Sequence, residues 1–157
     1  MTFRGSTTVQ DRIFASLPYL LPLMDVLPFG NFLLRQFPAL GLIYLPLAPL
    51  LAVYSQPFVS LVVFFVLFLA VVRNEKIAHF VRFNVMQAIL IGIVLSLLGL
   101  AFSILLRVLG TGLLVETLFN IIFLGTLAAS FYGIVQSALG RYAEIPGISE
   151  ASYLQVR

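Results

Sequence analysis

Two pairs of polar side chains interrupt long apolar runs at helical spacing, and they are the residues best placed to do chemistry. Asn84 and Gln87 are three residues apart, and Glu116 and Asn120 are four apart. Each pair therefore falls on one face of a helix. Amide groups in hydrocarbon need hydrogen-bond partners, so these candidate polar faces either dock helices against one another or line a hydrophilic path. The pattern favours docking, with the path as the alternative.

A second set of charged residues lies near the ends of apolar runs and comprises Asp25, Arg35, Arg107 and Glu116. Two acids and two bases at one membrane surface can pair and set how the helices meet. A functional interpretation is a polar vestibule that contacts a passenger polypeptide. The structural interpretation is ordinary charge at helix ends, with side chains reaching toward water.

The densest charge cluster holds Arg73, Glu75, Lys76, His79 and Arg82 within ten residues. It separates two long apolar runs, so we expect Arg73, Lys76 and Arg82 to be loop cations that fix the topology. His79 is a candidate pH sensor. Beside Lys76 and Arg82 it is better interpreted as an ordinary loop residue.

No arrangement of residues typical of catalysis is present. The chain has no cysteine and one histidine, which disfavours disulfides, thiolate chemistry and a structural zinc site. No HExxH motif occurs, and no GxSx sequence stands in the nucleophile context that a rhomboid-like protease needs. We therefore predict a protein that is not an enzyme, with no catalytic residue, no cofactor and no bound metal. The cations form no basic tract with exposed aromatics, so a nucleic-acid partner is not expected.

The composition is that of a membrane protein. Of the 157 residues, 61% are hydrophobic and only 10% are charged, whereas soluble domains carry roughly 25% charged residues. The sequence predicts an all-α polytopic membrane protein with one membrane domain over residues 1–157. The expected transmembrane helices cover about 13–29, 57–72, 83–106 and 113–139, followed by a polar tail at 140–157.

Residues 37–54 are apolar but rich in proline, and the distribution of cations decides whether they span the membrane. With four spans, seven cations fall on one side, namely Arg4, Arg12, Arg73, Lys76, Arg82, Arg141 and Arg157, and two fall on the other, Arg35 and Arg107. With five spans the split is three against six. The positive-inside rule favours four spans with both termini cytoplasmic or stromal. Residues 37–54 then form a re-entrant or interfacial segment.

Several segments together resemble the Tic-twenty family, which comprises membrane proteins of the chloroplast inner-envelope protein-import translocon and cyanobacterial relatives. The most specific are HFVRFNVMQAIL and the terminal GRYAEIPGISEASYLQV. The resemblance runs over nearly the whole chain and rests on residues 17–25, 35–40, 71–74, 79–90 and 140–156. It implies four membrane helices with both ends stromal or cytoplasmic, and no catalytic residues. Nuclear-encoded plant members carry a transit peptide, whereas the short polar start here is more similar to a cyanobacterial or plastid-encoded member.

The function that the resemblance implies is that of a membrane subunit of a protein translocon, in the plastid inner envelope or a cyanobacterial membrane. The expected partners are membrane lipid, other translocon subunits, further copies of the chain and translocating preproteins. Four helices leave little room for a pore that admits an extended polypeptide, so we expect the chain to work in an assembly. The alternatives are a small-solute transporter or channel and a non-conducting assembly scaffold. The absence of an inverted repeat disfavours the transporter.

Overall fold

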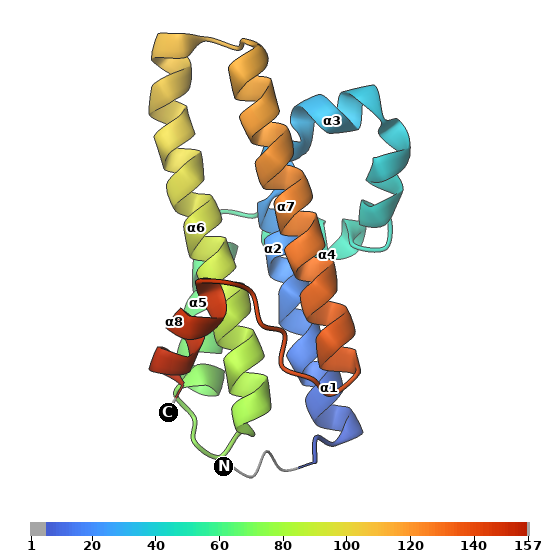
Figure 1. The fold of residues 1–157 in the computed structure, drawn as a ribbon, viewed down its shortest axis with the longest axis vertical. Coiled ribbons are helices and arrows are strands. Elements are labelled where there is room, and N and C mark those ends of the chain that lie inside the picture. The colour runs from blue at the N-terminus through green and yellow to red at the C-terminus, as the bar shows by residue number, and fades with distance from the viewer. Residues whose placement is uncertain (1–5, 157) are drawn as a thin grey trace.

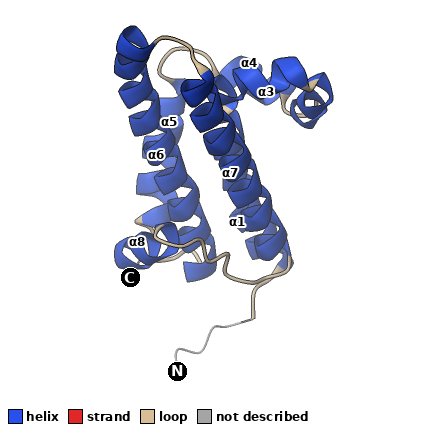
Figure 2. Cartoon of the chain, turned by 45° about the horizontal axis from the view of Figure 1, so that its top comes forward, coloured by secondary structure: helices blue, strands red, loops and turns tan. Residues whose placement is uncertain are grey.

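The computed structural model describes residues 6–156, and these residues form helices joined by short turns (Figures 1 and 2). No strand occurs in that range. The helices are α1 (Val9–Ser16), η1 (Leu17–Tyr19), α2 (Leu20–Asp25), η2 (Leu27–Gly30), α3 (Asn31–Gln36), η3 (Pro38–Tyr44), α4 (Ala48–Tyr54), α5 (Val59–Val66), η4 (Leu67–Val72), α6 (His79–Leu109), α7 (Leu113–Ala138) and α8 (Ile148–Gln155).

Two helices are long and apolar enough to cross a membrane, α6 with 31 residues and α7 with 26. They run antiparallel and are joined by a short turn (Figure 1). Gly110 adopts a positive φ of 66° in that turn, which a residue without Cβ adopts at little cost. Two further pairs of helices qualify as spans if each bent pair crosses once, which gives up to four crossings. The chain is thus an all-α polytopic membrane protein.

The first bent pair begins with a capping box. The Thr8 side chain accepts from the backbone N–H of Asp11, and the Asp11 carboxylate accepts from the N–H of Thr8. The helix then continues through α1, η1 and α2 and bends by 52° between Asp25 and Leu27. It packs against both α6 and α7, so these three long elements form the centre of the bundle.

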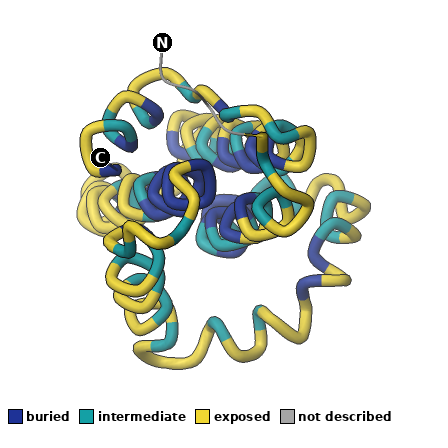
Figure 3. The backbone as a smooth tube through the Cα atoms, turned by 90° about the horizontal axis from the view of Figure 1, so that it is seen from below, coloured by how far each residue is buried: buried dark blue, intermediate teal, exposed yellow. Residues whose placement is uncertain are grey.

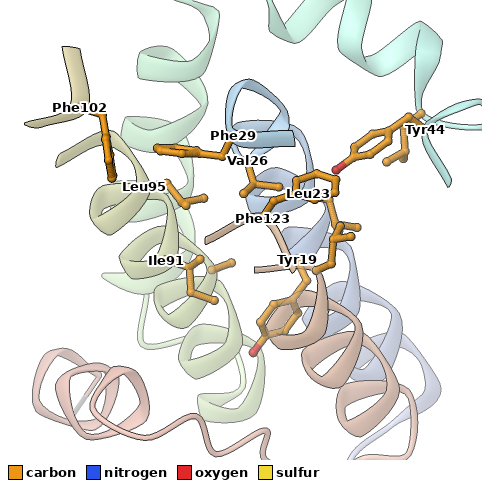
Figure 4. Close-up of a cluster of buried hydrophobic side chains, with 12 residues drawn as sticks. Tyr19, Leu23, Val26, Phe29, Tyr44, Ile91, Leu95, Phe102 and Phe123 are labelled. Atoms are coloured by element: carbon orange, nitrogen blue, oxygen red, sulfur yellow. The ribbon is translucent and has the colours of Figure 1, made fainter. Parts of the chain in front are cut away.

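The core between these elements is made of aromatic and branched side chains. Tyr19, Leu23, Val26 and Phe29 of the first pair meet Leu95 of α6 and Phe123 of α7 (Figure 4). Two glycines permit this close packing. A Cβ at Gly30 would lie 2.7 Å from the Phe123 ring, and one at Gly133 would lie 2.4 Å from the Tyr19 ring.

The second bent pair is less regular. α4 meets the helix Val59–Val72 at 96°, and Phe58 between them has a positive φ of 66°. The 14 residues of Val59–Val72 cover about 21 Å, less than a hydrocarbon core of about 30 Å. η3, which follows the first bent pair, and α4, which begins the second, project beside the bundle (Figure 2). Neither is long enough by itself to span a membrane, and α4 joins Val59–Val72 in the second bent pair.

The C-terminal segment folds back onto the start of α6. Its last helix, α8, packs against α6, and Tyr153 lies 4.5 Å from Phe83 between ring centroids. Tyr142 contacts the rings of Phe80 and Phe83. In the predicted polar tail at 140–157, both tyrosine rings therefore pack against the protein.

Exposed residues lie around the outside of the bundle (yellow in Figure 3), and many of them are large hydrophobic residues. Exposed residues include Leu97 (62%), Ile104 (61%) and Ile121 (61%) on α6 and α7. Such surface is costly in water and ordinary in lipid. The described chain begins and ends at the same end of the bundle, where the turn before α6 also lies (Figure 1). Arg4 and Arg157, two of the cations in the topology argument, lie outside the described residues.

Candidate functional site

Asn84 and Gln87 lie near the start of α6 and are fully buried in a hydrogen-bonded network. Tyr19 of η1 donates its hydroxyl to Asn84 Oδ1 at 2.7 Å and accepts from Gln87 Nε2 at 2.8 Å. Ser137 of α7 donates to the same Asn84 oxygen at 3.1 Å. One tyrosine therefore bridges both amides, and the network joins α6 to the first and last long helices.

The network also holds the segment after α7. Gln87 Nε2 donates to the backbone carbonyl of Ala143 at 2.6 Å, and Asn84 Nδ2 donates back to Phe80 O within its own helix. Gln87 Oε1 is buried and has no hydrogen-bond partner among the described residues. Because both amides have no exposed surface, we propose that they dock helices rather than line a water-filled path.

Glu116 and Asn120 lie far from this network, in the opposite half of α7. Asn120 is 17 residues from Ser137, which corresponds to about 25 Å along a helix. Glu116 is in the first turn of α7, where a carboxylate interacts favourably with the helix dipole. Asn120 Oδ1 is buried without a partner in the described part of the chain. The two polar faces predicted from spacing therefore do not meet.

Asp25 lies at a different depth from Arg107 and Glu116. Its Oδ1 accepts the hydroxyl of Tyr54 at 2.9 Å, and its Oδ2 lies against Gly92 of α6, 3.1 Å from where a Cβ would be. Gly92 is 13 residues from His79 and 17 from Leu109, or about 20 and 26 Å from the ends of α6. Asp25 is thus near the middle of the bundle.

The vestibule expected from Asp25, Arg35, Arg107 and Glu116 is accordingly not assembled among the described residues. Arg35 on α3 and Arg107 in the last turn of α6 are exposed. On α6, Arg107 is 15 residues beyond Gly92, about 22 Å from the level of Asp25. Arg107 and Glu116 lie at one end of the bundle, on either side of the turn between α6 and α7.

The cation cluster divides into a loop part and a helical part. Arg73 and Lys76 are exposed in the turn between η4 and α6, as expected of loop cations. Arg82 lies inside α6, is 7% exposed, and donates Nε–H to the Val72 carbonyl at 2.8 Å. It therefore satisfies an acceptor at the end of the π-helical turn η4. The expected position of Arg82 in a loop is corrected, because α6 begins at His79.

His79 is likewise a helical residue and not a loop residue. As the first residue of α6 it lies 2.9 Å from the Tyr142 hydroxyl through Nδ1 and 3.1 Å from the Val156 carbonyl through Nε2. Its ring stacks on Tyr153 with centroids 6.3 Å apart. The side chain thus holds the C-terminal segment against α6.

Two cavities open between the helices. The larger, about 640 Å³, lies between the first helix and the α5–η4 helix, and apart from Gln10, Asp11 and Lys76 its lining is apolar. The smaller, about 340 Å³, contains Asp25 and Tyr54 between α2, α5 and α6. Sequence reasoning did not identify Tyr19, Tyr54 or Ser137, because a tyrosine or serine in an apolar run gives no sign of its partner.

Comparison with known proteins gives consistent results along the chain. The family described as chloroplast import apparatus Tic20-like matches residues 8–152. A "Tic20 family protein" of the cyanobacterium Synechocystis sp. is 61% identical over 100% of this chain and 99% of its own length. "Protein TIC 20-II, chloroplastic" of Arabidopsis thaliana is 35% identical over 99% of this chain and 78% of its own. "Tic20 family protein Ycf60" of Porphyra purpurea is 37% identical over 99% and 80%.

Proposed function

This chain belongs to the Tic20-like family, and from that premise we propose that it is a membrane subunit of a protein translocon. The observation that carries the proposal is the match over residues 8–152 to a family described as a chloroplast import apparatus. Its relatives include proteins named as chloroplastic and a cyanobacterial protein. We therefore place the chain in the plastid inner envelope membrane or in the corresponding cyanobacterial membrane, where it helps to move precursor proteins.

The internal polar groups support a role within an assembly. Asn84 and Gln87 are fully buried and form hydrogen bonds with Tyr19, Ser137 and Ala143. They therefore offer no surface to a passing polypeptide. What the bundle presents outward is apolar helix surface. We propose that other subunits, or further copies of the chain, pack on this surface, and that any path for a precursor lies between them.

The second candidate is a non-conducting scaffold for assembly of another complex. The buried network favours this function too, because the buried amide groups of Asn84 and Gln87 line no polar path that a conducted substrate would use. The two functions differ in what the outer surface contacts during transport. In the scaffold case, the outer surface contacts subunits and lipid only.

Site-specific photocrosslinking in intact membranes separates them. A photoreactive residue replaces Ile104 or Ile121, both 61% exposed, while a precursor is arrested during translocation. We expect adducts to the precursor and to other subunits. A matched probe at Phe83, which is fully buried, controls for adducts that do not require exposure. Adducts to subunits without precursor favour the scaffold.

The proposed topology is testable because the chain has no cysteine. Single substitutions Ser6→Cys, Glu75→Cys and Glu150→Cys place thiols at exposed positions near one end of the bundle, and Thr111→Cys places one at the other. We expect a membrane-impermeant maleimide to label the first three from the cytoplasmic or stromal side, and Thr111→Cys only from the opposite side. Labelling of Glu75→Cys and Thr111→Cys from one face contradicts four crossings.

A further inference from the structure

The cavity of about 340 Å³ holds a carboxyl group at mid-depth and opens to the lipid side of the bundle. Asp25 lies in it, about 20 Å from the start of α6. Three of the residues that line it, Leu61, Ile93 and Leu97, are exposed apolar side chains. A group entering this cavity therefore comes from the bilayer and not from the interior of the bundle.

The polar atoms of the cavity are mainly acceptors. Asp25 Oδ1 accepts from Tyr54, and Oδ2 faces the Gly92 backbone with no hydrogen-bond donor among the described residues. The Ser96 hydroxyl donates to the Gly92 carbonyl at 2.9 Å. The lone pairs of Ser96 Oγ can therefore accept a hydrogen bond from a ligand. Ser60 adds another hydroxyl oxygen. A ligand with several N–H groups and positive charge complements this set.

The chain itself has no cation to offer at this depth. Carboxylates inside a membrane are expensive unless paired, yet Lys, Arg and His are all missing from residues 13–34, 36–72, 83–106 and 108–140. A second copy brings the same sequence and therefore no cation at mid-depth either. An ionised Asp25 therefore takes its counter-charge from a different protein.

We infer that this cavity receives the ammonium or guanidinium group of a lysine or arginine on a transmembrane helix of another subunit. The inference rests on the proposed function, since only a chain that works in an assembly has such a neighbour. The cation donates to Asp25 Oδ2 and to the oxygens of Tyr54 and Ser96. A volume of about 340 Å³ admits one long side chain and excludes a helix, so the partner helix lies outside against Leu61 and Leu97.

The inference is testable with a defined partner helix. The full chain, carrying a donor fluorophore at Ile104→Cys, is reconstituted in lipid vesicles with an acceptor-labelled polyleucine transmembrane peptide that has one central lysine. We expect association at least roughly tenfold tighter than for the matched peptide with central methionine, about the effect of one charge-assisted hydrogen bond. Asp25→Asn removes the difference. Glu116→Gln removes a carboxyl group in the first turn of α7, away from the cavity, and retains the preference for the lysine peptide.

A second variant keeps the test independent of folding defects in Asp25→Asn. Ser96→Leu fills the cavity from the exposed face of α6 and leaves Asp25 in place, and we expect it to reduce binding of the lysine peptide to the level of the methionine peptide. Equal association of both peptides with the unaltered chain overturns the inference. So does a lysine preference that survives in Asp25→Asn and in Ser96→Leu.

The peptide measurement does not depend on transport. Photocrosslinks that reach subunits but never a precursor refute the translocon role while leaving the lysine preference as it is. Loss of the lysine preference refutes the cation site while leaving precursor crosslinks as they are. The two proposals therefore fail separately.

Discussion

Replacement of Gly133 by valine is expected to lower the stability of the bundle more than any other single substitution of a small residue in α7. An ideal Cβ at this position lies 2.4 to 2.6 Å from three atoms of the Tyr19 ring. Tyr19 is fully buried, so its ring has no open space into which it can move. Overpacking of this kind costs about 1–3 kcal/mol, and sometimes more.

The matched control for Gly133 is in the same helix. Gly125 has nothing within 4 Å of an added Cβ, so Gly125→Ala is expected to be neutral or to stabilise α7 by up to about 1 kcal/mol through helix propensity. Unfolding in mixed detergent micelles, followed by circular dichroism, measures both variants. Equal midpoints for Gly133→Val and the unaltered chain contradict the packing described for Tyr19.

The second large effect is expected from Asn84→Leu. The substitution leaves the Tyr19 and Ser137 hydroxyls without the oxygen to which both now donate. Loss of the acceptor for these two buried donors is expected to lower the free energy of unfolding by about 1–3 kcal/mol in total. The same unfolding measurement gives the value. The corresponding control is Asn120→Leu, which removes an Oδ1 that has no partner in the described residues, and should be close to neutral.

A double-mutant cycle identifies the network as the cause. Tyr19→Phe removes one of the two donors, so Asn84→Leu should cost less in that background than in the unaltered chain. If the two substitutions are additive, Asn84 acts through packing volume and the hydrogen-bonded network is not the reason for its effect.

The sequence predicted the long helices because their apolar runs are uninterrupted. α6 and α7 contain the expected segments 83–106 and 113–139, apart from Leu139 at the end of α7. The predicted span begins at residue 83, four residues after the observed start of α6 at His79, because His79 and Arg82 are polar residues of the kind found in loops. Their partners, Val72 and Val156, are main-chain carbonyls, and a sequence does not show which carbonyls fold back onto a cation.

The candidate site could be predicted only in part. Asn84 and Gln87 were identified because amides in an apolar run need partners, but Tyr19 is 65 and 68 residues from them. The sequence predicts Asp25 at a membrane surface because this residue lies four positions before the end of the predicted span 13–29. The 52° bend after Asp25 and the 96° bend after α4 bring Asp25 and Tyr54 together at mid-depth, and such bends depend on tertiary packing.

If this chain is a translocon subunit as proposed, its outer surface meets the transported protein. The most direct measurement is the yield of crosslinks between a photoreactive residue at Ile104 or Ile121 and an arrested precursor, before and after the arrest is released. We expect a precursor adduct that disappears when transport resumes, and none from a probe at Phe83. Adducts that never contain precursor, under conditions in which the precursor is transported, contradict it.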